Sequence, residues 1–435
     1  MTRIVTRIVI VGGGFAGFHA AKALSRALPR EAGTEIVLVN RTDYFLYLPL
    51  LPEVAAAVVD PRRVTVSLPA ALPRVRLAQG DVTAVSLAER TVTYTDPEGH
   101  EHDLGYDRLV LAVGSVNKLL PIPGVAEHAH GFRDLAEGLY LRDHVIRQVE
   151  LAAATDDPAE RDARCTFVVV GAGYTGAEVA AQGPLFTKAI ARRHRELRGQ
   201  RMRWLLLDVA PRVLPGLHPR LARTADRVLR RRGVEVLLGT SVREATHDGV
   251  ELTNGEVVPT RTIAWCVGVR PDPLVGASGL KTRDGRLVVE PTLAVPDHPD
   301  VFACGDAAAV PDLTRPGELT AMTAQHAQRQ GKLAGRNVAA SLGHGRTRRY
   351  KHHDLGFVVD LGGAQAAANP LRIPLSGIVA KAVTRGYHLL AMPGNRIRTA
   401  VDWLLDAVLG RQSVQLGLVR SAAVPLDTEE LGQQG

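Results

Sequence analysis

Two stretches of the chain repeat one order of hydrophobic and polar positions. In each stretch, a run of apolar, mostly β-branched residues ends in a glycine-rich turn, and a helical pattern of small and apolar residues follows. The first stretch is Ile8–Leu28 and the second is Phe167–Ala181. An apolar strand that stops at glycines and opens into a helix is typical of a dinucleotide-binding fold. The pattern therefore predicts a duplicated nucleotide-binding unit.

The remaining pattern is also that of an α/β protein. Two strands around a turn at Pro97–Gly99 are predicted before a short buried strand, Arg108–Val113. After the second repeat, the runs RWLLLDV, VEVLLG, VELTNGEVV and RTIAWCVGV suit a second, mostly parallel sheet. From about Arg346 the chain changes to short amphipathic helices with glycines and basic residues. We predict two Rossmann-like dinucleotide-binding domains and a C-terminal amphipathic helical segment.

The predicted domain boundaries follow from this order of elements. Residues 1–118 and 286–345 are expected to form the first binding domain, split around a second domain of residues 119–285. Residues 346–435 are expected to form a segment at a membrane interface or a dimer interface. The charged, proline-containing stretch Thr155–Arg164 is expected to be a linker before the second repeat.

Composition excludes several classes of protein. A hydrophobic fraction of 46% is typical of a globular chain. The formal charge of +8 and the pI of about 9.6 would suit nucleic acid or an anionic membrane. Aromatic residues make up only 4% of the chain and do not interleave with a basic stripe, so we expect no nucleic-acid binding.

The three cysteines, Cys165, Cys266 and Cys304, are too few and too scattered for a disulfide framework or a dithiol pair. No metal site is expected. The strand RIVIVGGG follows Met1 almost at once, which leaves no room for a signal peptide, and no apolar run reaches the length of a membrane span. We expect a cytoplasmic protein that lies on a membrane surface or is free of it.

The first glycine fingerprint is Gly12, Gly14 and Gly17. The first glycine permits a tight turn, the second lets the backbone approach a pyrophosphate, and the third lets helix pack on strand. A Rossmann fold usually has an acid at the end of the second strand, but here the residue is Asn40, which can accept a ribose hydroxyl only without charge assistance. This difference favours FAD over NAD in the first unit.

The second fingerprint is Gly171, Gly173 and Gly176. The following strand ends in Asp208, which can bind ribose hydroxyls and would repel a 2′-phosphate, so NADH is favoured over NADPH. Arg212 lies nearby and could soften that preference.

Residues outside the two glycine fingerprints are also expected to contact the cofactors. Glu178, two residues after the last fingerprint glycine, is expected to point toward the nicotinamide; the alternative is an acid favoured by the helix N-terminus. In VFACGDAAAV, Asp306 at a strand end is expected to bind the flavin's ribityl hydroxyls. The remaining expected cofactor contacts are Arg41, Ala112, Gly114, Gly268 and Gly305.

Together these motifs resemble the two-dinucleotide-binding-domain flavoproteins of the pyridine nucleotide-disulfide reductase superfamily. The chain is most similar to the type II NADH:quinone oxidoreductases, and the likeness runs nearly end to end. It is carried by stretches such as NRTDYFLYLPLLPEVAA, YDRLVLAVGS, GAGYTGAEVA, APRVLPGLHPRL, TIAWCVGVRPDPL, PDVFACGDAA, TAQHAQRQGKLAGRNV and HHDLGFVVDLGG.

In that family an Ala-Gln-x-Ala-x-Gln-x-Gly pattern lines the quinone site beside the flavin. The resemblance places Gln325 there, but Arg329 stands where the pattern has its second glutamine. Arginine can only donate hydrogen bonds, which still suits a quinone carbonyl. The alternative is a helix that covers the flavin with a polar face. His326 is expected to be a surface or packed histidine.

The C-terminal segment carries a separate prediction. In IRTAVDWLLDAVLGR, one helical face is apolar, with Val401, Leu404, Leu405 and Val408 and Trp403 alongside them, and the other face carries Arg398, Asp402 and Asp406. Cationic, amphipathic helices with Trp and Tyr are typical of a membrane interface. We therefore expect this segment to hold the protein on the inner leaflet of the cell membrane, the alternative being a homodimer seam.

The predicted function is an FAD-dependent NADH dehydrogenase that passes two electrons from NADH to a membrane quinone without pumping protons. Glu178, Gln325 and Arg329 are the expected catalytic residues. Two alternatives stay open: a soluble flavin reductase that serves a ferredoxin or another small acceptor, and a non-catalytic NADH-sensing protein with the same fold.

Overall fold

The structure is a computed structural model that describes residues 6–353 and 355–427. Packing divides the chain into two compact units. Unit 1 comprises the chain up to Leu46, Thr65–Val116 and Arg270–His353, and unit 2 comprises Tyr47–Val64, Asn117–Val269 and the chain after His353. Each unit is built on a mainly parallel sheet with helices against it, so the predicted α/β class is confirmed.

Unit 1 contains a six-stranded sheet. Its strands, in spatial order, are β22 (Ala294–Val295), β23 (His298–Ala303), β9 (Arg108–Leu111), β1 (Thr6–Val11), β2 (Thr34–Asn40) and β5 (Arg76–Gln79). All neighbours are parallel except β22 and β23. The central strand β1 is buried from Ile8 to Val11, as expected for a parallel strand that is covered on both faces.

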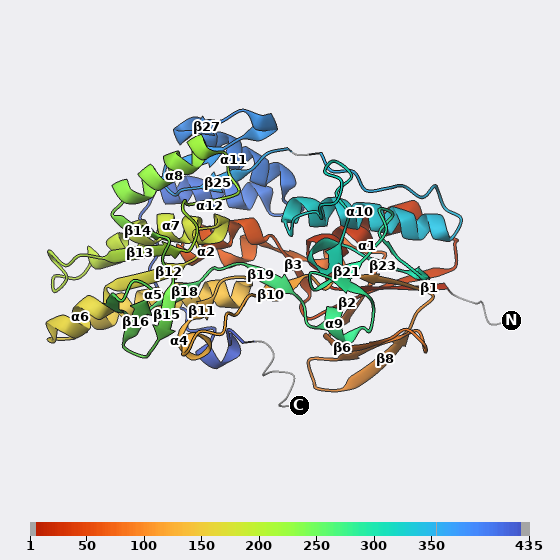
Figure 1. Ribbon diagram of the computed structural model, residues 1–435, viewed down its shortest axis with the longest axis horizontal. Coiled ribbons are helices and arrows are strands. Elements are labelled where there is room, and N and C mark those ends of the chain that lie inside the picture. Colours follow the sequence, from red (N-terminus) through yellow and green to blue (C-terminus); the bar gives the residue numbers. More distant parts are fainter. Residues whose placement is uncertain (1–5, 354, 428–435) are drawn as a thin grey trace. The chain divides into compact units, whose positions relative to one another are not determined.

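Helices α1 (Phe15–Ala27) and α10 (Ala324–Ser341) lie side by side in unit 1 (Figure 1). Two glycines of α10 make this close approach possible. A Cβ atom on Gly331 would collide with the carbonyl oxygen of Ala16, and one on Gly335 with that of Ala20. Only hydrogen at these positions lets the two backbones touch, so α1 is held where it follows the first glycine turn.

Smaller elements complete unit 1. The hairpin predicted around Pro97–Gly99 is confirmed by the antiparallel pair of β7 and β8. The short elements are β3 (Tyr44–Leu46), β4 (Thr65–Ser67), α3 (Leu68–Ala71), β6 (Asp81–Ser86), β7 (Thr91–Thr95), β8 (Glu101–Gly105), α9 (Leu274–Ala277), β20 (Thr282–Arg283), β21 (Arg286–Val288) and β24 (Ala308–Ala309). The chain passes between the units in β10 (Ser115–Asn117) and β19 (Val269–Pro271).

Unit 2 contains a five-stranded parallel sheet. Its strands, in spatial order, are β11 (His130–Gly131), β18 (Ile263–Trp265), β12 (Thr166–Val170), β13 (Arg203–Asp208) and β14 (Val234–Leu238). One face packs on a small antiparallel sheet of β15 (Val242–Ala245), β16 (Gly249–Leu252) and β17 (Val257–Pro259). Val168 and Val170 point into this core, where Leu426 is also buried.

Before the C-terminal part of unit 2, its longest helices are α5 (Leu135–Ala154) and α7 (Tyr174–Ala191). The shorter ones are α2 (Leu51–Ala55), α4 (Val125–His128), α6 (Pro158–Arg164) and α8 (Pro219–Arg231). Helix α6 lies in the stretch that was expected to be a linker. The side chain of Asp157 accepts the Ala159 N–H and Pro158 occupies the first turn, so this charged stretch starts a helix.

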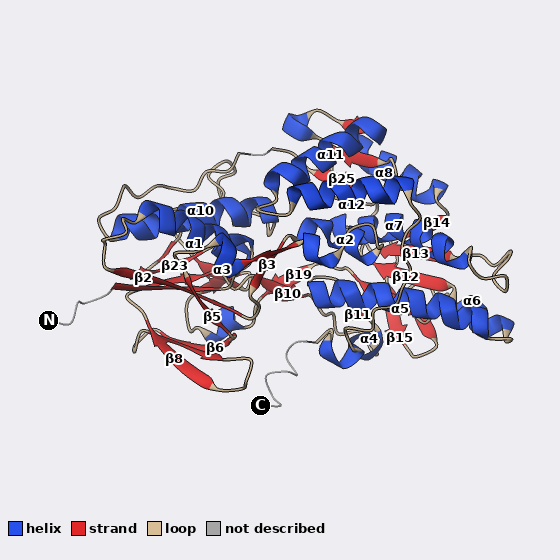
Figure 2. Ribbon diagram, turned by 180° about the vertical axis from the view of Figure 1, so that it is seen from behind, coloured by secondary structure: helices blue, strands red, loops and turns tan. Residues whose placement is uncertain are grey.

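The C-terminal part of unit 2 contains more than the predicted helices (Figure 2). A three-stranded antiparallel sheet, β25 (Val358–Asp360), β26 (Ala366–Ala368) and β27 (Leu375–Ser376), precedes helices α11 (Gly377–Ala391) and α12 (Arg396–Val408). The strands have three residues or fewer, which is too short for alternation to mark them in a sequence.

Helix α12 turns its two acidic residues toward the protein and most of its large apolar residues outward. Asp402 pairs with Arg63 at 3.1 Å, and Trp403 is only 4% exposed. The opposite face consists of exposed apolar side chains: Ile397, Val401, Leu404, Leu405 and Val408. The predicted apolar face is thus confirmed, apart from Trp403, which lies inside. Among the described residues, no helix combines the length and the hydrophobicity that a membrane span requires.

The contact between α1 and α10 predicts the effect of one methyl group. Replacing Gly331 by alanine should lower the free energy of unfolding by about 1–3 kcal/mol, because the new methyl must push α10 away from the Ala16 carbonyl. Urea unfolding of the purified protein measures the change. Gly386→Ala is the control: its Cβ meets nothing within 4 Å inside α11, so stability should hold or rise. Equal losses in both variants would contradict this account.

Candidate active site

The first glycine turn is shaped by the absence of side chains. Gly12 follows β1 with a φ of 95°, and a Cβ on it would strike the carbonyl of Ala112. A Cβ on Gly17 would strike the carbonyl of Gly12, so α1 packs directly on the turn. Beside Gly14 there is open space, and no side chain caps the start of α1. The free N–H groups of a helix start are a binding site for phosphate.

The second glycine turn in unit 2 has the same geometry. A Cβ on Gly171 would strike the carbonyl of Cys266, and one on Gly176 would strike the carbonyl of Gly171. Gly173 again faces open space and starts α7 without a side-chain cap. Both turns therefore fit the pyrophosphate of a dinucleotide.

The residues at the ends of the second strands occupy equivalent places. Asn40 Oδ1 accepts the Gly13 N–H at 2.6 Å, and its Nδ2 donates to the Thr42 carbonyl at 2.8 Å. Asp208 accepts the N–H groups of Ala172 and Ala210. Each side chain is thus fixed beside its glycine turn, and only Asp208 brings a negative charge.

The other residues singled out near the two turns differ in their surroundings. The guanidinium of Arg41 pairs with Asp81 at 2.9 Å on the surface. Arg212 donates to the carbonyl of Pro215 in its own loop, at 2.6 Å. Ala112 is buried under the first turn, whereas Gly114 and Gly268 have positive φ angles of 80° and 104°.

Gly305 and Asp306 are held by polar side chains of unit 1. Asp306 Oδ2 accepts a hydrogen bond from the Ser115 hydroxyl at 2.7 Å. The Gly305 N–H donates to Gln330 Oε1 at 2.9 Å, and Gln330 Nε2 donates to the Thr320 hydroxyl at 2.9 Å. Gln330 was not singled out from the sequence, although it lies within the quoted QHAQRQG stretch, and it is the buried residue that fixes this turn.

The first two turns of α10 carry Gln325 and Arg329, the residues predicted to face the quinone. Arg329 donates to the carbonyl of His353 and lies 3.2 Å from Nδ1 of His352. His326 is buried, its Nδ1 is 2.9 Å from the Tyr350 hydroxyl, and its ring stacks on His352 with centroids 4.0 Å apart. Of the two expected places for His326, surface or packed, the structure shows the packed one.

Glu178 belongs to a cluster of charged groups inside unit 2. Its Oε1 accepts the N–H of Asp360 at 2.8 Å. The carboxylate of Asp360 in turn pairs with the ammonium of Lys381, which lies 3.7 Å from Glu53 Oε1. Glu53 also accepts the indole N–H of Trp403. One lysine thus stands among three carboxyl groups.

Burial governs the protonation of this cluster. Burial raises the pKa of Glu178 well above its usual range, and the nearby charges of Asp360 and Glu53 act in the same direction. Burial also raises the pKa of Glu53 to about 7, against the opposing effect of Lys381. The Tyr47 hydroxyl lies 3.1 Å from Nδ1 of His388, whose pKa burial lowers to about 4. The cluster therefore holds protons on carboxyl groups near neutral pH.

Only Glu178 was predicted as a site residue. Glu53, Asp360 and Lys381 are each a single charged residue within an apolar run: LPEVAA, FVVDLGG and GIVAKAV. Charged residues are almost never fully buried unless they are paired, so a lone charge in such a run is the signal that could have found them.

No two of the three cysteines are bonded to each other. All three are free thiols in the structure. Burial raises the pKa of Cys165 to about 11 and those of Cys266 and Cys304 to about 12, so none is a nucleophile near neutral pH. Within the described residues, no group of His, Cys, Asp and Glu is arranged to hold a metal ion.

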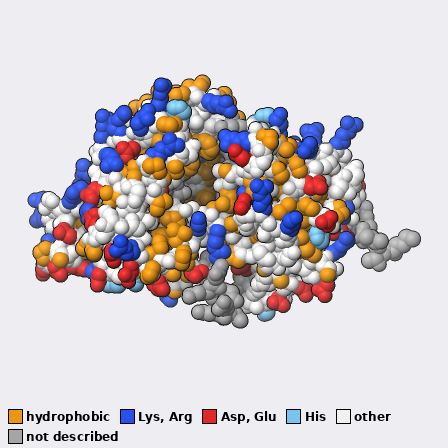
Figure 3. Space-filling view, in the orientation of Figure 1, with side chains coloured by type: hydrophobic (Ala, Val, Ile, Leu, Met, Phe, Trp, Pro, Cys, Tyr) orange, Lys and Arg blue, Asp and Glu red, His pale blue; other side chains and the backbone are white. Residues whose placement is uncertain are grey.

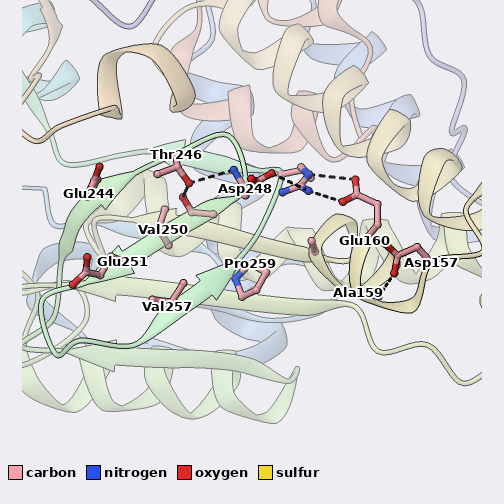
Figure 4. Close-up of a pocket in the computed structure, with 13 residues that line it drawn as sticks. Asp157, Ala159, Glu160, Glu244, Thr246, Asp248, Val250, Glu251, Val257 and Pro259 are labelled. Atoms are coloured by element: carbon pink, nitrogen blue, oxygen red, sulfur yellow. Dashed lines mark hydrogen bonds and ion pairs between the residues drawn. The ribbon is translucent and has the colours of Figure 1, made fainter.

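A groove in unit 2 lies apart from these residues, between α6 and the β15–β17 sheet (Figure 4). Arg261 pairs there with Glu160 and Asp248. The groove is lined by carboxylates and apolar side chains and includes none of the predicted site residues.

Comparison with known proteins identifies the class. The pyridine nucleotide-disulphide oxidoreductase family matches residues 6–331, and the chain belongs to this family. The chain is 32% identical to the type II NADH:quinone oxidoreductase NdhA of Mycobacterium tuberculosis, over 95% of this chain and 89% of that protein. More particularly, it is a member of the type II NADH:quinone oxidoreductases, and FAD and NADH are its cofactors.

A second curated protein and a solved structure are also similar to this chain. The type II NADH:quinone oxidoreductase of Staphylococcus aureus is 25% identical over 85% of this chain and 91% of its own length. The solved structure of NDH2 from Plasmodium falciparum in complex with NADH has the same fold, with a TM-score of 0.85 at 17% identity, over 94% of this chain and 99% of that one.

The raised pKa of Glu53 predicts how stability depends on pH. In the folded protein Glu53 keeps its proton up to about pH 7, whereas in the unfolded chain it ionises at lower pH. The stability that the protonated Glu53 contributes is therefore lost as the pH rises from its unfolded-state pKa through about pH 7. Glu53→Gln should become more stable relative to wild type by roughly 1–3 kcal/mol between about pH 5 and about pH 8.

Chemical denaturation across that pH range measures this difference. Glu98→Gln, on the exposed turn between β7 and β8, is the control and should track wild type at every pH. A stability difference between Glu53→Gln and wild type that stays constant with pH would show that Glu53 is ionised throughout.

Proposed function

We propose that the chain is an FAD-dependent NADH dehydrogenase that reduces a membrane quinone and moves no protons across the membrane. The observation that carries the proposal is the pair of matching glycine turns, each with an uncapped helix start and open space at its middle glycine. A chain that contains this phosphate-binding turn twice is suited to bind two dinucleotides. A non-catalytic NADH sensor would need only one.

Unit 2 is proposed to bind NADH and unit 1 to bind FAD. Gly171, Gly173 and Gly176 would hold the pyrophosphate of NADH, and Asp208 would bind its ribose and repel a 2′-phosphate. In unit 1, the turn at Gly12–Gly17 and the carboxylate of Asp306 would hold FAD. Bound FAD supplies the two-electron chemistry between NADH and the acceptor.

The buried cluster around Glu178 is proposed to supply protons. Reduction of a quinone to a quinol takes up two protons with two electrons, so the enzyme needs groups that are protonated near neutral pH. Glu178 and Glu53 meet this requirement, because burial raises the pKa of each. Gln325 and Arg329 are proposed to face the quinone, where the arginine would donate to a quinone carbonyl.

An anaerobic titration tests this function. NADH should bleach the flavin absorbance of the purified protein, a quinone should restore it, and NADPH should bleach it far less because of Asp208. Glu178→Gln should still be bleached by NADH but should turn over quinone about 100-fold more slowly, with a flatter pH profile. Glu150→Gln, an exposed change on α5, is the matched control.

Three outcomes would contradict parts of the proposal. Equal bleaching by NADH and NADPH would remove the role of Asp208. Reoxidation by a ferredoxin and by no quinone would replace the acceptor. Unchanged quinone turnover in Glu178→Gln would show that protons enter by another route.

The outer face of α12 is proposed to rest in the cytoplasmic leaflet of the membrane. Ile397 is 81% exposed, Val408 73% and Leu404 63%. The inner face is committed to the protein, because Asp406 pairs with Arg411 at 3.1 Å and Trp403 donates to Glu53. A helix whose polar face is already bonded presents its apolar face to a less polar phase. A homodimer seam is the alternative occupant.

Polar substitutions on the outer face of α12 distinguish membrane binding from a homodimer interface. The triple variant Val401→Ser, Leu404→Gln and Val408→Ser should bind phosphatidylcholine vesicles at least tenfold more weakly than wild type in a flotation assay. Val257→Ser, which changes an equally exposed apolar residue of β17, should bind like wild type. If the triple variant binds vesicles normally but wild type alone is a dimer by light scattering, the face is a dimer seam.

A further inference from the structure

Helix α8 of unit 2 has an outer surface made almost entirely of arginine. Its inner side is apolar and buried, through Leu221, Ala222, Ala225 and Leu229. Its exposed arginines are Arg220, Arg223, Arg227, Arg230 and Arg231. Figure 3 shows Lys and Arg side chains gathered over this helix.

These charges are hardly compensated. The one acid of α8, Asp226, pairs with Arg230 at 3.1 Å. Across residues 6–353 and 355–427, Arg220, Arg223, Arg227 and Arg231 take part in no ion pair with a carboxylate. Arg223, Arg227 and Arg231 are spaced four residues apart and so lie in one row. Like charges at this spacing destabilise a helix, which argues for a partner that neutralises them.

Helix α8 lies beside a segment of the same unit that exposes apolar side chains. Helix α8 packs against β26 and β27, and the guanidinium of Arg232, just after its end, donates to the carbonyls of Leu361 and Gly362 in the turn before β26. The segments that flank β27 carry large apolar side chains that are mostly exposed. Their exposed fractions are 69% for Leu371, 58% for Ile373, 71% for Ile378 and 58% for Val379. Figure 3 shows hydrophobic side chains along the upper edge, next to the basic surface.

We propose that the arginine row of α8 binds the phosphate headgroups of anionic lipids while the neighbouring apolar tip, Leu371, Ile373, Ile378 and Val379, enters the bilayer. This inference rests on the membrane attachment in the proposed function. Arginine binds phosphate oxygens through two parallel N–H donors, and basic residues near an anionic leaflet are attracted to its surface potential. In this proposal, part of the dinucleotide-binding unit 2 makes the protein prefer anionic membranes.

The apolar tip is what favours a lipid surface over nucleic acid. A nucleic-acid strand would neutralise the arginines but would leave four large aliphatic side chains in water beside it. Helix α8 also carries no aromatic residue on which a base could stack. An anionic bilayer covers both parts of the surface at once.

Vesicle flotation tests the inference with two lipid compositions, phosphatidylcholine alone and an equal mixture with phosphatidylglycerol. Wild type should bind the mixture more tightly, and added salt should weaken that preference. The variant Arg223→Gln, Arg227→Gln and Arg231→Gln should lose roughly fivefold in binding to the mixture for each arginine, on the order of a hundredfold in all. Its binding to phosphatidylcholine alone should stay close to that of wild type.

A second triple variant removes the same charge elsewhere in unit 2. Arg192→Gln, Arg195→Gln and Arg198→Gln change exposed arginines in the segment after α7, which Gln200 ties to α6 at 2.7 Å. This control should keep most of the preference for phosphatidylglycerol, and thermal unfolding checks that both variants fold.

The outcomes separate this inference from the membrane proposal itself. If both triple variants lose affinity equally, net charge and not the α8 row is responsible, and the inference fails. If wild type binds both lipid mixtures equally, the inference fails while membrane attachment stands. If wild type binds no vesicle, the membrane proposal fails with it. If wild type binds a single-stranded oligonucleotide more tightly than anionic vesicles, the partner of the α8 row is nucleic acid and the inference fails.

Discussion

The structure depends on two places where a backbone carbonyl occupies the space of a missing side chain. The carbonyl of Gly12 lies where a Cβ of Gly17 would be, and the carbonyl of Gly171 lies where a Cβ of Gly176 would be. This contact brings each helix onto the end of its strand, and each helix starts without a side-chain cap. The position of α1 then fixes α10 through Gly331 and Gly335, and α10 in turn fixes Gly305 through Gln330.

Features set by local chemistry could be predicted from the sequence. The two glycine turns, the buried strands that precede them, the hairpin around Pro97–Gly99 and the apolar face of α12 all follow from residues that are neighbours in the chain. The family resemblance extended the prediction to the whole α/β architecture, which is confirmed. The assignment of individual residues to cofactor and quinone stays a prediction.

Features set by distant contacts could not be predicted in this way. Glu53, Asp360 and Lys381 are far apart in the sequence, and no periodicity relates them; only the fold brings them to Glu178. The inward position of Trp403 has the same origin, because its partner Glu53 lies 350 residues away. The charged stretch with α6 was mistaken for a linker because a helix start and a linker use the same residues, Asp and Pro.

The bond between Trp403 and Glu53 has a consequence for how this enzyme can be cut. Helix α12 and the residues after it are tied into unit 2, through Glu53 and through Leu426 in the hydrophobic core. Proteolysis after α11 would leave a buried carboxyl group without its indole donor and a core without one of its leucines. The segment proposed to contact the membrane is therefore also structural, and removing it would yield a destabilised protein.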